Sequence, residues 1–145
     1  MKILVAVDGS SNSLLAVRHV LQLLHEGLRA DIVLATVQEP TYVYEMILAP
    51  DAGVMERLTG AVGSRALADA EALLKQSGVP YTRDIGSGET APALLAIAKQ
   101  QGCSQIVLGA RGLGAVQGVL LGSVSQRVLR ESTVPVTVVK EGAAF

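Results

Sequence analysis

Four short runs of almost uninterrupted apolar residues, rich in valine and isoleucine, do most to limit how this chain can fold. They occupy residues 3–7, 32–37, 106–108 and 136–139. Unbroken apolar runs of this length are typical of strands buried on both faces, as in a parallel sheet between two layers of helices. A fifth and weaker strand is predicted over residues 81–85, where Arg83 and Asp84 suit the exposed edge of a sheet.

Segments with helical periodicity separate these runs. Apolar side chains recur there at spacings of three and four, which is the pattern of a helix with one buried face. The expected helices cover residues 14–24, 54–76, 91–98 and 123–132. We expect Ser11 or Ser13 to cap the first of them, because a serine side chain can accept a hydrogen bond from a free N–H group of the first turn.

This alternation of strand and helix predicts an α/β fold, in which a doubly wound, five-stranded parallel sheet carries helices on both faces and residues 1–145 form a single domain. Ligands of such sheets bind beyond the carboxyl ends of the strands, where the winding direction reverses. If the strands at 3–7 and 106–108 are neighbours at that point, the residues that follow them form one site. The longest irregular connection covers residues 38–53, and no pattern in it predicts a conformation.

The composition excludes several classes of protein. Hydrophobic residues make up 50% of the chain and charged residues 17%, which rules out a disordered chain. With a net charge of −1 and an aromatic content of 3%, the chain offers neither a basic surface nor stacking platforms, so we expect no nucleic acid partner. No apolar stretch approaches the roughly 20 residues that span a bilayer, so we expect no membrane partner. Cys103 is the single cysteine, which excludes an internal disulfide and fits a cytoplasmic protein.

A glycine motif follows the third apolar run and has the spacing Gly109-x2-Gly112-x9-Gly122-Ser123. Glycine permits a sharp turn and lets backbone N–H groups approach a ligand without an intervening Cβ atom. Gly122 and Ser123 open a predicted helix, whose free N–H groups and dipole favour an anion, and Ser125 adds a hydroxyl donor in its first turn. The motif therefore predicts a phosphate cradle. The alternative is a flexible connection whose glycines only form turns.

Three further residues are candidates for a nucleotide site. Asp8 follows the first apolar run, where its carboxylate could accept hydrogen bonds from ribose hydroxyls or approach a Mg²⁺ ion that bridges phosphates; alternatively, it closes a local turn. Val37 ends the second run and either offers its backbone groups to an adenine edge or is an ordinary buried valine. Arg111 lies inside the glycine motif and either reaches a phosphate or stays solvated.

These residues resemble those of the universal stress protein family. The resemblance rests on residues 3–10, on the glycine motif with Val124 and Ser125, and on residues 134–139, so it extends over nearly the whole chain. It implies a Rossmann-like fold of the adenine nucleotide alpha hydrolase-like type. The chain keeps every glycine of the motif, which resembles the ATP-binding branch of the family. One departure is Thr36, which stands before Val37 where many members carry a histidine.

For the site, the resemblance implies ATP or another adenine nucleotide, bound with Mg²⁺. Asp8 is then expected near the ribose or the metal ion, and Val37 near the adenine. The residues expected around the ribose and the phosphates are Gly109, Gly112, Gly122, Ser123, Val124 and Ser125. The resemblance also implies a homodimer formed through the last strand, residues 136–139. An apolar strand at a sheet edge favours pairing with a second strand, unless the tail of residues 140–145 covers it.

Together with the nucleotide site predicted from the residues, the resemblance implies an ATP-binding protein that acts as a dimeric regulator of a stress response. One alternative is a slow ATP hydrolase that uses the same pocket. The chain has no GxxxxGK[ST] loop, and only Asp8 and Arg111 are placed to assist phosphoryl transfer. His19 and His25 fall in the first helical segment, where a packed or solvated role is commoner than catalysis. Another alternative is a dimeric interaction protein whose nucleotide site is vestigial.

Overall fold

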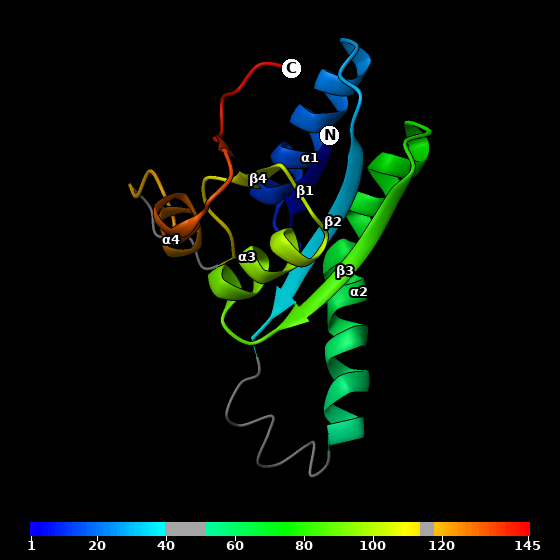
Figure 1. The fold of residues 1–145 in the computed structure, drawn as a ribbon, viewed down its shortest axis with the longest axis vertical. Helices are drawn as coiled ribbons and strands as arrows, with labels where there is room; N and C mark the ends of the chain where they lie inside the picture. The colour runs from blue at the N-terminus through cyan, green and yellow to red at the C-terminus, as the bar shows by residue number, and fades with distance from the viewer. Residues whose placement is uncertain (40–51, 114–117) are drawn as a thin grey trace.

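The computed structural model describes residues 1–39, 52–113 and 118–145 (Figure 1). Most of the irregular connection expected over residues 38–53 lies outside them. Strands and helices alternate along the described residues as the sequence predicts. Their bounds are β1 (Lys2–Ala6), α1 (Ser11–His25), β2 (Asp31–Gln38), α2 (Ala52–Gln76), β3 (Tyr81–Ser87), α3 (Thr90–Gln100), β4 (Gln105–Gly109), α4 (Ser123–Glu131) and β5 (Val136–Val139). None of these helices, over its described residues, combines the length and the apolar character that a membrane crossing needs.

The strands form one parallel sheet in the order β3-β2-β1-β4-β5. The chain builds outward from β1 to β3, crosses back and continues from β4 to β5, so the winding reverses between β1 and β4. In the register of the sheet, Ala6 lies opposite both Ala35 of β2 and Leu108 of β4. The carboxyl ends of these central strands therefore meet at one edge of the sheet. This confirms the predicted doubly wound fold and places the residues after β1 beside those after β4.

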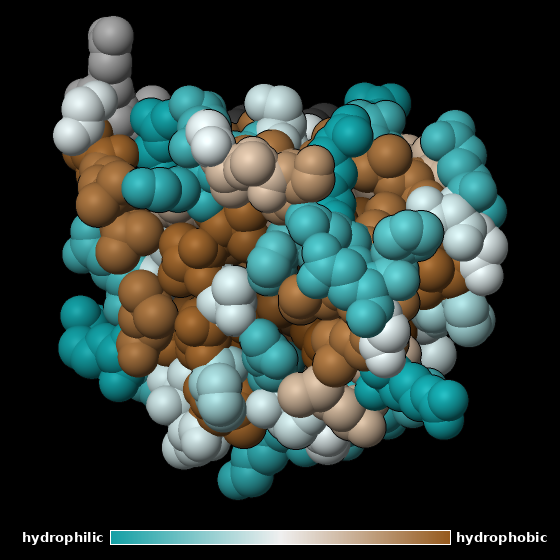
Figure 2. All heavy atoms as spheres, turned by 90° about the horizontal axis from the view of Figure 1, so that it is seen from above, coloured by the Kyte–Doolittle hydropathy of each residue, from teal (hydrophilic) through white to brown (hydrophobic). Residues whose placement is uncertain are grey.

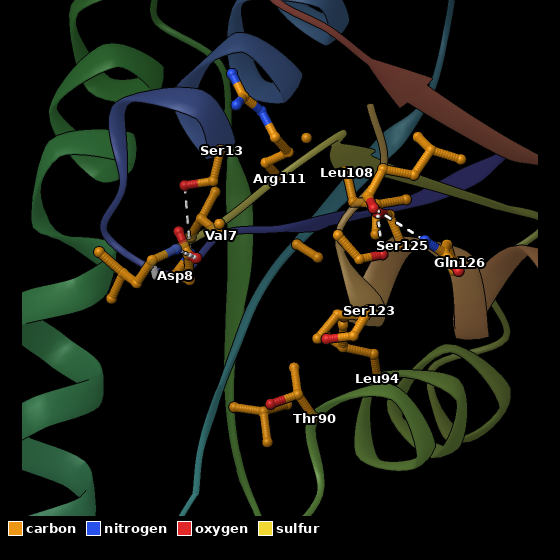
Figure 3. Close-up of a pocket in the computed structure, with 18 of the residues that line it drawn as sticks. Val7, Asp8, Ser13, Thr90, Leu94, Leu108, Arg111, Ser123, Ser125 and Gln126 are labelled. Carbon is orange, nitrogen blue, oxygen red and sulfur yellow. Dashed lines mark hydrogen bonds between the residues drawn. The ribbon is translucent and has the colours of Figure 1, made fainter. Parts of the chain in front are cut away.

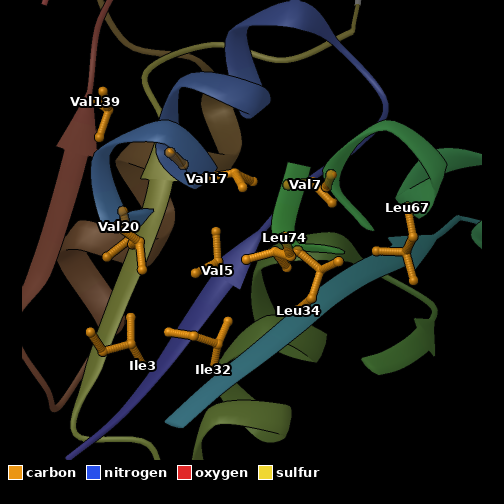
Figure 4. Packing of buried hydrophobic residues seen from close by; sticks show 13 residues of the cluster. Ile3, Val5, Val7, Val17, Val20, Ile32, Leu34, Leu67, Leu74 and Val139 are labelled. Atoms are coloured by element: carbon orange, nitrogen blue, oxygen red, sulfur yellow. The ribbon is translucent and has the colours of Figure 1, made fainter. Parts of the chain in front are cut away.

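Successive residues of the central strands point to opposite faces of the sheet, and helices cover both faces. On one face, Ile3 and Val5 belong to a cluster with Val17 of α1 and Leu74 of α2 (Figure 4). On the other face, Leu4 belongs to a second cluster, to which α3 and α4 contribute. Each large aliphatic side chain that is fully buried contributes about 1.5–3 kcal/mol to stability. The apolar runs are unbroken because both sides of each strand are buried in this way.

The two edge strands of the sheet differ in chemistry. β3 carries polar side chains: the Tyr81 hydroxyl donates a hydrogen bond to Glu71 of α2 at 2.8 Å, and the Arg83 guanidinium donates to the same carboxylate at 3.1 Å. β5 has the sequence VTVV, in which only Val139 is buried and the other three residues are half-buried. β3 therefore confirms the edge strand predicted for residues 81–85, and β5 is the apolar edge on which the predicted homodimer depends.

Candidate functional site

A cavity of about 410 Å³ lies beyond the carboxyl ends of β1, β2 and β4. Its walls come from the turn after β1, the end of β2, the first turns of α3 and α4, and the segment after β4 (Figure 3). This volume is in the range of small-molecule sites, about 300–1,000 Å³. The structure brings all nine predicted site residues to the cavity: Asp8, Val37, Gly109, Arg111, Gly112, Gly122, Ser123, Val124 and Ser125.

The turn between β1 and α1 is closed by its own residues. The Ser10 side chain accepts a hydrogen bond from the Ser13 N–H group at 3.1 Å, so Ser10 caps α1 rather than Ser11 or Ser13 as predicted. These serines stand close together, and only the backbone shows that Ser10 takes the extended conformation of a cap (φ −77°, ψ 155°). The Asp8 Oδ1 atom accepts the Ser10 N–H group at 2.9 Å, which is the local turn that the sequence allowed as one role of Asp8.

Asp8 also reaches across to the segment after β4. Its Oδ2 atom accepts the Leu113 N–H group at 2.7 Å, and a Cβ atom at Gly112 would overlap the same oxygen. Burial alone would raise the pKa of Asp8, but hydrogen bonds from two serines and from Leu113 outweigh it and hold this pKa below its ordinary value. Asp8 is therefore a charged carboxylate that joins two distant stretches of the chain, and its close approach requires glycine at 112.

The two ends of the segment between β4 and α4 lie next to each other. The Ala110 carbonyl accepts two hydrogen bonds, from the Gly122 N–H group and from the Ser125 hydroxyl, each at 2.7 Å. Gly109 is required by packing, because a Cβ atom there would lie 2.8 Å from the Asn12 carbonyl oxygen in α1. Gly122 has no such steric role in the fold, because a Cβ atom there meets other atoms only at 3.6 Å and beyond.

The N-terminus of α4 opens at the cavity without a side-chain cap. Gly122 is the N-cap residue, although its backbone angles (φ −72°, ψ 167°) are accessible to any residue. Among the described residues, no side chain accepts a hydrogen bond from the N–H groups of residues 123–125, which line the cavity. Free amides at a helix N-terminus carry a partial positive charge and bind anions.

The side of the cavity next to β2 is apolar. Val37 and Leu94 of α3 line it and pack in the same apolar cluster. The Ala35 carbonyl points toward β1, where it accepts the Val7 N–H group at 2.9 Å. Backbone groups alternate in direction along a strand, so the N–H and C=O groups of Val37, two residues later, point to the same side as the Ala35 carbonyl. Because β1 has ended at that level, these two groups of Val37 face the cavity. Val37 therefore offers one N–H and one C=O group to the polar edge of a planar ring.

Two lining residues of α3 are absent from the sequence prediction. Thr90 and Leu94 reach the cavity because α3 packs across the end of β2. The Thr90 N–H group and hydroxyl both donate to the Glu39 carboxylate, at 3.2 and 2.8 Å, which fixes the start of α3 to the end of β2. Helical periodicity identifies the buried face of α3 but gives no sign of which helix end reaches a ligand, so no signal in the sequence could have found them.

Asp8 and Arg111 are the two charged side chains among the described residues that line the cavity, and both are bound within the protein. The guanidinium of Arg111 turns away from Ser123 (Figure 3) and lies 3.1 Å from the Glu141 carboxylate, so its phosphate contact stays a prediction. Asp8 is the sole carboxylate among the described lining residues. In the described part of the chain, no three His, Cys, Asp or Glu side chains gather to hold a metal ion. A Mg²⁺ ion here would take most of its ligands from water and phosphate oxygens, which is common for this ion.

Comparison with known proteins agrees with this architecture. The sequence profile of the universal stress protein family matches residues 1–140, nearly the whole chain. The chain belongs to the universal stress protein family. Universal stress protein YxiE of Bacillus subtilis is 32% identical over 149 residues, covering 96% of this chain and 98% of its own length. A universal stress protein of Thermus aquaticus is 36% identical over 141 residues, covering 95% and 97%.

Solved structures of the family share the fold of this universal stress protein. A universal stress protein in complex with cAMP is 27% identical, with a TM-score of 0.69 and 96% of each chain covered. A universal stress protein family member from Burkholderia pseudomallei is also 27% identical, with a TM-score of 0.67 and coverage of 95% of this chain and 94% of that chain. The parallel five-stranded sheet with helices on both faces is therefore the family fold.

Proposed function

We propose that this universal stress protein binds ATP or another adenine nucleotide, together with Mg²⁺, in the cavity beyond β1 and β4. The observation that carries the proposal is the uncapped N-terminus of α4, whose amides lie at a cavity bordered by the glycine motif. Backbone amides suit phosphate because they are fixed in place before the ligand arrives. The relative solved with cAMP, itself an adenine nucleotide, supports the proposal.

The chemistry of the cavity orients the proposed nucleotide. The adenine ring takes the apolar side, against Val37 and Leu94, with its polar edge on the backbone of Val37. The phosphates take the amides of residues 123–125. Asp8 is the carboxylate for the ribose hydroxyls or, through water, for Mg²⁺. Each of its oxygens accepts one backbone hydrogen bond, which leaves further lone pairs for these contacts.

The proposed output is regulatory. Bound nucleotide stabilises one conformation of the glycine motif in a dimeric, cytoplasmic protein that binds other proteins during stress. A ligand present at a hundred times its Kd stabilises the folded state by about 2.7 kcal/mol. That free energy can shift a conformational equilibrium without any chemical step, provided that the nucleotide binds one conformation better than the other.

Titration of the purified protein with ATP and Mg²⁺ tests the nucleotide site. The wild type should bind and Gly122→Val should not, because a branched side chain intrudes on the amides of α4. Gly60→Val is the matched control, since a Cβ atom at Gly60 meets no described atom within 4 Å. Normal ATP binding by a folded Gly122→Val protein would contradict the site. Timed release of ADP in the same samples separates a binder from a slow hydrolase: turnover that is lost in Asp8→Ala would support hydrolysis.

We also propose that two copies of the chain pair through β5. The carbonyls of Pro135 and Val139 accept hydrogen bonds from β4 and the next segment, so the backbone groups of Val136 and Val138 point outward. The tail leaves this edge and runs toward α1, where the ring of Phe145 lies 6.4 Å from that of His19 (Figure 1). Hydrophobic residues gather on the side of the molecule where α4 and β5 lie (Figure 2, left). An apolar edge of this kind favours a second strand.

Sedimentation velocity tests the β5 pairing. Val138→Pro removes an outward N–H group and leaves the hydrogen bonds to β4 intact, so it should convert a dimer into a monomer. Val138→Thr keeps the N–H group and the β-branched shape and should remain dimeric. A wild-type protein that sediments as a monomer at every concentration would reject the proposal.

A further inference from the structure

The C-terminal tail contacts Arg111, a residue that lines the cavity, through one carboxylate. Glu141 follows β5 by two residues, and its Oε2 atom lies 3.1 Å from Nη2 of Arg111 in the glycine motif. Its Oε1 atom accepts a hydrogen bond from the Asn12 side chain at 3.2 Å. Asn12 is buried in the first turn of α1, and its Oδ1 atom accepts the Arg111 N–H group at 3.3 Å. Asn12 therefore fixes the backbone of Arg111 and the carboxylate that holds its guanidinium.

This pair decides where the charge of Arg111 acts. Arg111 is the sole cation among the described residues that line the cavity. Its guanidinium points away from Ser123, so its charge is directed to Glu141 and not to the amides of α4 (Figure 3). An arginine in reach of phosphate forms strong, charge-assisted hydrogen bonds. A phosphate within reach of this guanidinium would therefore compete with Glu141 for it.

The ion pair between Arg111 and Glu141 is partly exposed to solvent. The side chain of Glu141 is 66% exposed and that of Arg111 24% exposed. Ion pairs with an exposed partner are weak, because water and salt screen them. A triphosphate carries more charge than one carboxylate, whereas adenosine carries none and leaves the pair undisturbed. The outcome then depends on the number of phosphates that the ligand brings.

We propose that Glu141 competes with the phosphates of the nucleotide for Arg111, so that a polyphosphate nucleotide releases the C-terminal tail from the glycine motif. The inference rests on the proposed nucleotide function. Glu141 lowers the affinity for ATP and leaves the affinity for adenosine unchanged. Because coupling between two binding events is reciprocal, ATP loosens the tail that follows β5.

A double-mutant cycle across a ligand series tests this competition. Calorimetry measures the Kd of adenosine, AMP and ATP for the wild type, Glu141→Gln, Arg111→Gln and the double variant. Glu141→Gln should bind ATP about two- to five-fold more tightly, the range expected for a weak ion pair, with a smaller gain for AMP and none for adenosine. The gain should vanish in the Arg111→Gln background. Glu131→Gln is the matched control, since it removes the same charge from an Arg127 pair that lies outside the cavity.

A second measurement follows the tail itself. The chain has no tryptophan, so Phe145→Trp places a single fluorophore near its end. ATP should change the emission of this residue, adenosine should not, and the response should be lost with Arg111→Gln. An equal change in affinity for ATP and adenosine in Glu141→Gln, a gain that persists without Arg111, or no gain at all would overturn the competition. Failure of the folded wild type to bind any adenine nucleotide would instead reject the proposed function and, with it, this inference.

Discussion

The N-termini of α1 and α4 both lie at the cavity, but they are completed in opposite ways. At α1, Ser10 accepts the Ser13 N–H group, and Asp8 in turn accepts the Ser10 N–H group. At α4, the cap position is held by Gly122, and the amides of residues 123–125 have no side-chain cap among the described residues. Both helices present the same polarity of dipole to the cavity. The difference is that a side chain of the protein accepts a hydrogen bond from the first turn of α1, whereas no described side chain does so at α4.

This difference assigns the two stretches separate tasks. At α1, the serines complete the first turn, and Asp8, besides its proposed contact with the nucleotide, holds the segment after β4 through the Leu113 N–H group. The start of α4 is the proposed binding surface, because no side chain among the described residues binds its amides. α4 is only nine residues long, and a helix dipole contributes only about 0.3–1 kcal/mol at an exposed site. In the proposed site, direct hydrogen bonds from the amides therefore supply most of the affinity for phosphate.

Giving α4 a side-chain cap, as Ser10 gives α1, has the largest expected effect. Gly122→Asp places a carboxylate over the amides of residues 123–125, where it takes their hydrogen bonds and repels phosphate. The affinity for ATP should fall at least about a hundredfold, equivalent to about 2.8 kcal/mol, while the free energy of unfolding rises by about 0.5–1 kcal/mol. Calorimetric titration and urea unfolding measure the two quantities.

Gly122→Asn is the matched control for this substitution. It offers a cap of similar shape without the charge, so its affinity for ATP should fall less, by about tenfold. ATP affinity that is unchanged in Gly122→Asp would show that the phosphates bind elsewhere.

Breaking the contact between the two stretches has the next largest effect. Gly112→Ala forces a Cβ atom against Asp8 Oδ2, so the hydrogen bond from Leu113 must open. A hydrogen bond to a charged group contributes about 1.5–3 kcal/mol, part of which water restores at this half-buried site, so unfolding should cost about 1–2 kcal/mol less. Urea unfolding measures the change, with Gly60→Ala in α2 as a control that should not destabilise. Equal free energies of unfolding for Gly112→Ala and the wild type would show that the contact with Asp8 does not hold the two stretches together.

Removing the side-chain cap of α1 should lower the free energy of unfolding and leave the affinity for ATP nearly unchanged. Ser10→Ala removes the acceptor for the Ser13 N–H group and should lower the free energy of unfolding by about 1 kcal/mol. The affinity for ATP should change by less than about threefold, because the proposed phosphate site is at the amides of α4. Ser10→Asp keeps an acceptor and should retain most of the stability. A large loss of ATP affinity in a stable Ser10→Ala protein would assign the ligand to α1 instead.

Lowering the pH should have the smallest effect, by weakening the hydrogen bonds to the Asp8 carboxylate. The pKa of Asp8 is lower in the folded protein than in the unfolded chain, so its contribution to stability is fully present above the unfolded pKa of about 3.9. That contribution is lost as the pH falls from there through the folded pKa. The difference in unfolding free energy between the wild type and Asp8→Asn should therefore shrink as the pH falls below about 4. A constant difference over that range would show that the charge of Asp8 has no part in the link.

The fold and many of the residues that line the cavity could be predicted from the sequence, because their signals are local. Apolar runs indicate strands buried on both faces, and Gly109, Gly112 and Gly122 are spaced between a strand and a helix. Contacts between distant residues leave no such signal. Thr90 reaches the cavity only through the packing of α3, and the pairing of Glu141 with Arg111 depends on where the tail leaves β5. The sequence also does not show that the contact with Asp8 requires glycine at 112, whereas Gly122 has no steric role in the fold.

The most direct test of the account is an NMR titration of the ¹⁵N-labelled wild type with ATP and Mg²⁺. The account predicts that the amide signals of Ser123, Val124 and Ser125 shift most, because their N–H groups gain phosphate acceptors, while the amide of Ser13 shifts little because Ser10 already holds it. Shifts concentrated at the start of α1, or binding of ATP that leaves the three α4 amides unmoved, would contradict the central claim.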